Sequence, residues 1–380
     1  MLYYNLTIAA ILFVLFLLVI WNIFILRVRT FNPIPDELLP FVSVLIPARN
    51  DERKIKDCLN SLLNQNYPRY EVIVLDDNST DSTGKIIQKL KTDNQKLKVL
   101  KGSEISEGWI GKQYACFQLS EEAKGDWLLF TDADTIHREY SLRNSVILAI
   151  NRKADLLSLI PNQIMKTFIE KLIIPIFHFT TLTFLPFYFL ENSSNPKFTI
   201  GIGQFMLFKR EAFEKIGGYG SIKNNMVDDV WIARKIKEYK LQLIIADGKD
   251  ILDCRMYESF GDIWEGFSKN IYAGLGYNIF LAFIIIFLYL ILFIFPFIFL
   301  IYYIALKGLY DNNVFLLSLQ VIFNYLMRFS LSLKFRLNSI SDILHPAGIF
   351  IIVIIALNSI RLVLFGKGPV WKGRTYSRNK

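Results

Sequence analysis

Two pairs of closely spaced carboxylates are the residues of this 380-residue chain best suited to chemistry. Asp132 and Asp134 lie one residue apart in the turn-like sequence TDADT. Mg²⁺ and Mn²⁺ prefer oxygen ligands and commonly bridge a carboxylate to phosphate oxygens, so this pair suits a metal-bound diphosphate. Asp228 and Asp229 open the helical stretch DDVWIARKIKEY, where they suit a general base at the floor of a pocket.

Both pairs also have a purely structural interpretation. Asp side chains cap turns and helices, which is the alternative role of Asp132 and Asp134. Acidic residues at a helix N-terminus are stabilised by the helix dipole, which is the alternative role of Asp228 and Asp229. His137 could join a metal at the first pair, although a surface position on the helix that follows is the preferred interpretation.

Other polar residues come directly after apolar runs of strand length. Pro47–Arg49 follows FVSVLI, Asp76–Asp77 follows YEVIVL, and Asp132 follows WLLFT. In an open α/β sheet the carboxyl ends of the strands line one crevice, so we expect these residues to share a binding site. One carboxylate of Asp76–Asp77 suits a hydrogen bond from a nucleobase, with an Asx-turn as the alternative. Lys112, in the glycine-flanked GWIGK, suits a phosphate or simple solvation.

The elements that would position these residues alternate between strands and helices. The runs FVSVLIP, YEVIVLDD, LKVLKG and DWLLFTDAD predict strands. Between the first two, a helix is predicted with one apolar stripe, formed by Ile55, Cys58, Leu59, Leu62 and Leu63. Strands that alternate with helices form βαβ units, so the pattern predicts an α/β fold with a mostly parallel sheet covered by helices.

The chain is too apolar to be a wholly soluble domain, with 53% hydrophobic residues and a mean hydropathy of +0.34. Asn5–Leu26 carries no charge and is long enough to cross a bilayer. Arg27 and Arg29 follow at once, which predicts an uncleaved anchor with the next residues in the cytoplasm. Three further apolar stretches lie near the C-terminus, at residues 277–306, 314–333 and 343–365.

The number of C-terminal spans is left open by the sequence. Asn324 and Arg328 interrupt the second stretch, and polar side chains inside a span rarely face lipid. Asn358 and Arg361 interrupt the third stretch in the same way. Three spans would place the basic tail 366–380 outside the cell, whereas two would keep it inside, as the positive-inside rule favours.

Taken together, the motifs resemble the pattern of glycosyltransferase family 2. They are PARNDE at 47–52, VLDDNSTD at 74–81, TDADT at 131–135, GGY at 217–219 and VDDVWIARKIK at 227–237. The resemblance implies the GT-A nucleotide-diphospho-sugar transferase fold, which has a Rossmann-like, mostly parallel sheet. WEGFSKN at 264–270 and WKGRTY at 371–376 resemble the membrane-anchored branch that includes carotenoid-acid (4,4'-diaponeurosporenoate) and hopanoid-associated glycosyltransferases.

The resemblance implies roles for individual residues. The nucleotide-sugar would be bound by Pro47, Ala48, Arg49, Glu52, Asp77, Lys112 and Asp132. Asp134 would hold the Mg²⁺ or Mn²⁺ that bridges the diphosphate, and Asp229 would be the general base. Asp228 would assist it, standing where the family has the longer Glu. The acceptor region would include Gly203, Gln204, Trp264 and Lys269.

These roles predict a single displacement with inversion, from a nucleotide-sugar such as UDP-glucose to a membrane lipid such as a carotenoid acid. The QxxRW motif of processive members is missing, which favours transfer of one sugar over polymer synthesis. The alternatives are a polyprenyl-phosphate sugar transferase, a polysaccharide-synthesis glycosyltransferase, and a membrane-anchored nucleotide-sugar-binding protein without catalysis. A transporter or channel is disfavoured, because a body of more than 200 residues carries acids at its strand ends.

The predicted domain map comprises an anchor at 1–30, a cytoplasmic GT-A domain at 36–276, a C-terminal membrane region at 277–365 and a tail at 366–380. Asp134 and Asp229 must face one donor, so the apolar segment 168–190 between them cannot cross the membrane once. It is predicted to be interfacial or pocket-lining, with a buried core helix as the alternative.

The net charge of +9 is unevenly distributed along the chain. The predicted GT-A domain holds 31 Lys and Arg against 32 Asp and Glu, and the basic excess therefore lies in the flanking membrane regions. There it can orient the spans and meet anionic lipid, so nucleic acid is not an expected partner. The prediction is a multi-pass protein of the cell membrane, and the sequence does not indicate an oligomeric state.

Overall fold

The computed structural model describes residues 1–26, 32–337, 340–366, 368, 370–372 and 374–375. Contacts between residues divide the chain into two compact units, each assembled from separate stretches of sequence. Unit 1 comprises Met1–Ile25, Met165–Phe187 and Tyr257–Lys380, and unit 2 comprises Leu26–Ile164 and Tyr188–Met256. Every acidic residue singled out in the sequence therefore belongs to unit 2.

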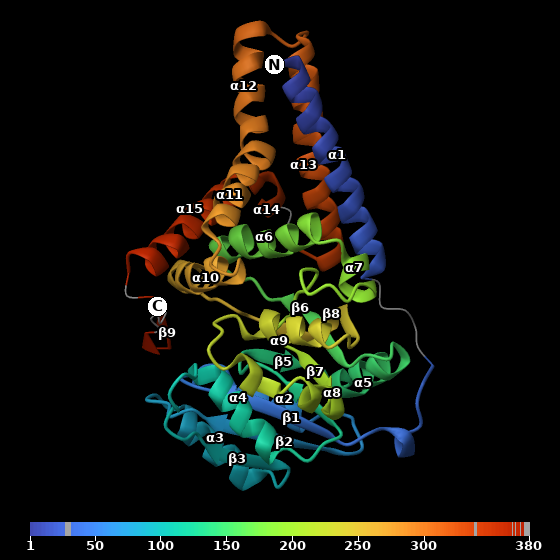
Figure 1. The fold of residues 1–380 in the computed structure, drawn as a ribbon, viewed down its shortest axis with the longest axis vertical. Helices are drawn as coiled ribbons and strands as arrows, with labels where there is room; N and C mark the ends of the chain where they lie inside the picture. The colour runs from blue at the N-terminus through green and yellow to red at the C-terminus, as the bar shows by residue number, and fades with distance from the viewer. Residues whose placement is uncertain (27–31, 338–339, 367, 369, 373, 376–380) are drawn as a thin grey trace. The chain divides into compact units, whose positions relative to one another are not determined.

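Unit 2 is built around one eight-stranded sheet with the order β3-β2-β1-β4-β7-β6-β8-β5 (Figure 1). Its strands are β1 (Val42–Ala48), β2 (Tyr70–Asp76), β3 (Leu97–Lys101), β4 (Trp127–Phe130), β5 (Thr135–His137), β6 (Leu156–Gln163), β7 (Met206–Lys209) and β8 (Leu243–Cys254). β1 pairs in parallel with β2 and β4, and β2 with β3. β6 and β8 are also parallel. β7 is antiparallel to both β4 and β6, and β5 is antiparallel to β8.

The predicted α/β fold is confirmed, and its parallel block is the part that the sequence pattern described. The four strands predicted from apolar runs are β1 to β4, and they are adjacent in the sheet. The first helix, α2 (Ile55–Leu63), buries the whole predicted apolar stripe. The sheet is mixed, because β7 and β5 run antiparallel to their neighbours. β7 follows the glycine-rich segment and pairs with β4, and β5 follows the turn after β4 and pairs with β8.

Further helices of unit 2 pack around this sheet. They are α3 (Thr83–Asp93), α4 (Gly111–Glu122), α5 (Ser141–Asn151), α8 (Arg210–Lys215) and α9 (Asp228–Glu238). Of these, α3 and α5 share one apolar core with α2 and the strands. α4 contacts β1 and β2, while α5 and α9 contact β8. Both α4 and α9 begin with residues of the candidate site, so the packing of these two helices fixes the position of Lys112 and of the acidic pair.

Unit 1 is helical. Its main helices are α1 (Leu2–Ile25), α6 (Phe168–Phe184), α10 (Phe260–Gly274), α11 (Ile279–Phe293), α12 (Phe295–Lys307), α13 (Asn312–Phe335), α14 (Ile340–Ile343) and α15 (His345–Leu364), while α7 (Phe187–Asn192) begins in unit 1 and continues into unit 2. Four helices among the described residues are long and apolar enough to cross a membrane, namely Leu2–Ile25, Ile279–Lys307, Asn312–Phe335 and His345–Leu364. α1 and α13 lie side by side (Figure 1).

The predicted topology depends partly on residues that are not described. Arg27 and Arg29, which carry the predicted orientation of the first anchor, lie outside the described residues, as do several residues of the tail 366–380. Of that tail, Val370–Trp371 and Arg374–Thr375 form the short antiparallel strands β9 and β10. The orientation of the spans and the side of the tail therefore stay predictions.

Two of the polar residues inside the apolar helices, Asn324 and Asn358, contact other helices of unit 1, whereas Arg361 is exposed. Asn324 is fully buried and donates hydrogen bonds to the carbonyl oxygens of Leu292 (3.0 Å) and Gln320 (2.9 Å). Asn358 donates to Ser268 Oγ at 2.9 Å, which joins α15 to α10. Polar side chains in a membrane helix are tolerated when they face other helices, so these residues are compatible with membrane crossing.

Helix α6, whose sequence could suggest a span, is held by two groups of hydrogen bonds. Its N-terminus carries a capping box between Thr167 and Glu170, which satisfies backbone groups at the start of the helix. At the other end, the buried Asn22 of α1 donates to the carbonyl oxygens of Leu182 and Leu185, both at 2.8 Å. Asn22 also accepts from the backbone N–H of Phe187 at 2.9 Å, so one side chain fixes the corner after α6.

We expect Asn22→Leu to destabilise the protein, because three buried backbone groups around α6 would lose their partner. Each unsatisfied buried group costs about 1–3 kcal/mol, so the loss should be at least about 2 kcal/mol. Thermal unfolding of the detergent-solubilised protein would measure it. Thr7→Val is the control, since Thr7 is exposed and bonds only to its own helix. Equal unfolding temperatures for the two variants would contradict the prediction.

Candidate active site

The strand register brings the polar residues after β1, β2 and β4 to one edge of the sheet. Ala48 at the end of β1 is opposite Asp76 at the end of β2, and Leu45 is opposite Phe130 at the end of β4. The backbone N–H of Asp77 donates to the carbonyl of Ala48 at 2.8 Å, so the loops beyond the two strands also touch. The strand ends that the sequence predicted to line one crevice are therefore neighbours.

Lys112 connects the two acidic pairs. Its ammonium group lies 2.8 Å from Asp132 Oδ1 and 3.5 Å from Asp228 Oδ2. Burial lowers the pKa of Lys112, but the two carboxylates outweigh burial and hold that pKa well above its ordinary value. Lys112 is therefore a permanent positive charge, positioned by its place at the start of α4.

Asp229 is held by the backbone around it. Its Oδ2 accepts from the N–H of Gly203 at 3.0 Å, and its Oδ1 accepts from the N–H of Val230 at 2.8 Å. Burial and the neighbouring charge of Asp228 raise the pKa of Asp229 to about 7, against the opposing effects of Lys112 and the two N–H groups. A carboxylate with a pKa near neutrality can accept a proton and release it again under physiological conditions.

Two glycines allow the segment before β7 to approach this carboxylate. A Cβ atom on Gly201 would lie 2.1 Å from the carbonyl oxygen of Asp229, so only glycine fits there. A Cβ atom on Gly203 would lie 3.4 Å from both Asp229 Oδ2 and Lys112 Nζ. The missing side chain at Gly203 therefore leaves room between a base and a cation.

Asp134 faces a different set of neighbours from Asp132. Its Oδ1 accepts from the thiol of Cys254 at 3.7 Å, and its Oδ2 lies 4.0 Å from Lys54 Nζ. Asp132 and Asp134 together offer partly exposed carboxylate oxygens, which are hard ligands that suit Mg²⁺ or Mn²⁺. No three His, Cys, Asp or Glu residues form a metal cluster in the described part of the chain. A cation here would thus need further oxygen ligands from a substrate or from water.

His137 is not the surface residue that the sequence suggested. It lies in β5, is buried, and its Nε2 contacts the hydroxyls of Thr131 (3.0 Å) and Thr135 (3.2 Å). Its Nδ1 contacts the hydroxyl of Ser141 at 3.0 Å. Burial lowers the pKa of His137 to about 3, so the ring is neutral. Both ring nitrogens contact hydroxyl groups, and two of these belong to Thr131 and Thr135, which flank the Asp132–Asp134 turn.

The predicted nucleoside-binding residues lie on the loops after β1 and β2. Arg49 donates to the carbonyl oxygens of Asp77 and Asn78, which ties the two loops together. Pro47 and Ala48 are the last two residues of β1. Asp77 is buried at the end of β2, as a base-contacting carboxylate would require.

Glu52 has a structural contact that the motif did not indicate. Its carboxylate accepts from the backbone N–H of Ser82 at 2.9 Å, at the start of α3. Its own N–H donates to Asp81 Oδ2 at 3.1 Å. Glu52 therefore holds the loop after β1 against the α3 N-terminus, which is compatible with an indirect role in nucleoside binding.

The four residues predicted for the acceptor region fall in different units. Gly203 and Gln204 belong to unit 2, where the carbonyl of Gln204 accepts from Thr131 Oγ1 at 2.7 Å. Trp264 and Lys269 lie on α10 of unit 1, where Trp264 packs in a cluster with residues of α6. The first two adjoin the acidic site directly, and the roles of all four stay predictions.

Two further residues of the site escaped the sequence analysis. Lys54, close to Asp134, also donates to the carbonyl of Arg255 at 2.8 Å. Gln113 is buried and donates to the carbonyl of Asn225 in the loop that leads to α9. Lys54 is one of many basic residues on amphipathic stretches, and nothing in its spacing marks it. Gln113 had a weak signal, because it adjoins Lys112.

Comparison with known proteins identifies the domain that carries this site. Residues 43–217 match the family model described as Glycosyl transferase family 2. The resemblance predicted from the motifs is therefore confirmed for these residues, which are the part of the chain that matches the family.

The chain is similar to two curated relatives of one name. It is 27% identical over 243 residues to 4,4'-diaponeurosporenoate glycosyltransferase of Staphylococcus aureus strain USA300, a match that covers 62% of this chain and 62% of the relative. The protein of the same name from Staphylococcus haemolyticus is 26% identical over 237 residues, with 61% of each chain covered. The match thus spans about three fifths of the length of these relatives.

The fold is similar to that of a solved glycosyltransferase. Mannosyltransferase PcManGT from Pyrobaculum calidifontis, solved in complex with GDP-Man and Mn²⁺, superposes with a TM-score of 0.55. The superposition covers 94% of this chain and 98% of that chain at 17% sequence identity. This likeness concerns the fold, and together with the family match it confirms the predicted GT-A class.

We expect Gly201→Ala to lower activity about 10–100-fold, because the new methyl group must displace the backbone that carries Asp229. Gly220→Ala is the matched control, since a Cβ atom there would meet no atom within 4 Å. Steady-state kinetics with purified protein, after a check of folding by thermal unfolding, would measure the effect. Equal activities of the two variants would show that the close approach of Gly201 has no role in the site.

Proposed function

We propose that this protein transfers a single sugar from a nucleotide-diphospho-sugar to a membrane lipid, with inversion at the anomeric carbon. The observation that carries the proposal is the half-buried Asp229 carboxylate, with a pKa near 7, beside the permanent positive charge of Lys112. A base and a cation that both adjoin Gly203 can act on the two ends of one displacement. The family 2 domain supports the nucleotide-sugar as the donor.

In this mechanism Asp229 takes the proton from the acceptor hydroxyl or carboxyl group as its oxygen attacks the anomeric carbon. The N–H groups of Gly203 and Val230 fix the carboxylate so that one orientation is presented to the acceptor. Asp228 keeps the pKa of Asp229 high, which makes Asp229 a stronger base than an ordinary carboxylate. No covalent sugar–enzyme intermediate is needed, because the attack and the departure occur in one step.

On the donor side, Lys112 offsets the negative charge that develops on the departing nucleoside diphosphate. Asp134 and Asp132 would hold a divalent cation, which when bound neutralises the diphosphate oxygens. PcManGT, which shares the fold, was solved with GDP-Man and Mn²⁺, and this supports the choice of Mg²⁺ or Mn²⁺. Arg49 and Asp77 bring together the loops that would receive the nucleoside.

The lipid acceptor and the membrane location rest on unit 1 and on the relatives. Four described helices could cross a membrane, and the relatives are named for glycosyl transfer in 4,4'-diaponeurosporenoate metabolism. A carotenoid acid or a similar lipid is accordingly the proposed acceptor. We place unit 2 in the cytoplasm of the cell, where nucleotide-sugars are made, and propose an interfacial position for residues 168–190.

A panel assay would test this function. Membranes that contain the protein would be incubated with radiolabelled nucleotide-sugars and Mg²⁺ or Mn²⁺, followed by mass spectrometry of the extracted lipids. We expect one labelled lipid that carries one sugar. Label found only in insoluble polymer would contradict single transfer, and label on a polyprenyl phosphate would identify the alternative acceptor.

We expect Asp229→Asn to lower transfer about 10²–10⁴-fold, because the amide cannot accept the acceptor's proton. Calorimetric titration should show that binding of the nucleotide-sugar is retained. Glu238→Gln is the matched control, since it removes an exposed acid from the other end of the same helix. A loss of donor binding in Asp229→Asn would show that Asp229 is not the base.

The pH dependence should report the ionisation of Asp229. Below pH 7 this carboxyl is increasingly protonated and cannot accept a proton, so kcat/KM should fall about tenfold per pH unit on the acid side and level off above about pH 7. Asp228→Asn removes a charge that raises the pKa of Asp229, so the acid limb should move to lower pH. An unmoved limb in this variant would argue against the coupling of the two carboxylates.

A further inference from the structure

A pocket in unit 1 combines an apolar wall with two polar groups. It is lined by Phe168, Lys171 and Leu172 of α6, by Ser341 of α14, and by Leu344 at the start of α15. Its empty volume is about 380 Å³, part of it open to solvent. Without the open solvent the cavity is about 120 Å³, which is smaller than a typical ligand pocket of about 300–1,000 Å³, so it suits a headgroup and at most a short part of a chain.

The polar side of the pocket carries a net positive charge. Lys171 forms no ion pair with any described residue. Behind the pocket, the buried Arg328 donates to Ser341 Oγ and to the carbonyl of Pro175, both at 3.2 Å, and lies 3.3 Å from Asp342 Oδ1. Asp342 is therefore paired with Arg328, which leaves Lys171 as the charged residue that lines the pocket, and an added anion would balance its charge.

Buried polar atoms beside the pocket have hydrogen-bonding capacity that described residues do not use. Nε of the fully buried Arg328 and Oδ2 of Asp342 have no partner among the described residues. The same is true of both ring nitrogens of His345, which is fully buried and follows Leu344 in the sequence. Buried polar groups in folded proteins are nearly always satisfied, so we expect bound water behind the pocket, while the His345 ring packs against Phe179 and Phe293.

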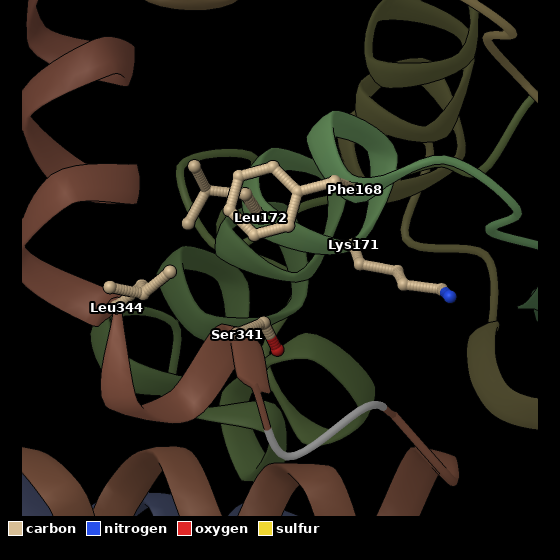
Figure 2. Close-up of a pocket in the computed structure, with 5 residues that line it drawn as sticks. All are labelled: Phe168, Lys171, Leu172, Ser341 and Leu344. Atoms are coloured by element: carbon tan, nitrogen blue, oxygen red, sulfur yellow. The ribbon is translucent and has the colours of Figure 1, made fainter.

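The apolar wall distinguishes this pocket from a simple anion site. Figure 2 shows the Phe168 ring beside Leu172, with Leu344 near them, while the Lys171 side chain runs away from Leu344 and places its amine at the edge. Phe168 is 56% exposed, so its ring is accessible to an apolar chain that enters the pocket. Unit 1 also contains the helices that could cross a membrane, and a membrane would supply the acyl chain of a lipid.

We propose that this pocket binds the anionic headgroup of a membrane lipid. The headgroup oxygens pair with Lys171 on the side of the pocket that Ser341 also lines, and the first part of the chain lies along Phe168, Leu172 and Leu344. The site stands apart from the proposed sugar transfer, because it requires neither the nucleotide-sugar nor Asp229. Lipid binding in the pocket can therefore fail while sugar transfer persists, and sugar transfer can fail while lipid binding persists.

Binding of oleate to the full-length protein in detergent would test the proposal. Thermal unfolding would be followed as oleate is added, since a ligand that binds the folded state raises the unfolding temperature. We expect oleate to stabilise the protein, and oleyl alcohol and acetate to do so much more weakly. Equal stabilisation by oleyl alcohol would show an apolar site only, and equal stabilisation by acetate would show a free-anion site. Either result would overturn the proposal.

Two variants locate the effect. Lys171→Gln should weaken oleate binding about tenfold or more, and Lys171→Arg should largely keep it, because the charge is retained. Lys166→Gln is the matched control, since Lys166 is exposed nearby and does not line the pocket. An oleate affinity that is the same in Lys171→Gln as in Lys166→Gln would overturn the assignment, and Lys171→Arg keeps the test valid if the glutamine variant folds poorly.

Discussion

The arrangement of three carboxylates around one ammonium group is the constraint on which unit 2 depends. Asp132, Asp228 and Asp229 approach from different segments, and Lys112 is the cation that faces the first two directly. Two like charges 4 Å apart repel by about 4 kcal/mol at an effective dielectric constant of 20, so such a cluster forms only where the fold holds it. Three features of the fold hold the cluster together. They are the register of the parallel strands, the starts of α4 and α9, and the glycines before β7.

The same electrostatics explains how one site can contain carboxylates with different tasks. Both Asp132 and Asp229 are half-buried, but Asp132 is paired with Lys112, whereas Asp229 lies next to a second acid and accepts hydrogen bonds from backbone N–H groups. Two nearby carboxyl groups with such different surroundings are a general sign of acid–base function. A donor diphosphate adds negative charge to this site, so the cations near it, Lys112 and Lys54, must lie on the donor's side of the cluster.

The parts of the fold that repeat along the sequence could be predicted from it, and the parts that depend on distant contacts could not. The stripe of α2 and the ends of β1, β2 and β4 follow from local periodicity, and the structure places them as expected. His137 was misplaced because its burial depends on three hydroxyl groups that meet only in the folded sheet. Lys54 could not be found for the same reason, since its partner Asp134 is 80 residues away in sequence.

The polar residues of the apolar helices lead to a more general conclusion about unit 1. In the sequence they weaken the prediction of membrane spans, because hydropathy treats each residue as if lipid surrounded it. In the structure Asn22, Asn324 and Arg328 are fully buried and bond to backbone carbonyls of neighbouring helices. Apolar side chains pack about equally well against lipid and against each other, so they cannot select one helix arrangement alone. The few polar groups can, because their hydrogen bonds to the carbonyl oxygens of neighbouring helices form in this packing, and the residues that argue against a span also help to specify how the helices assemble.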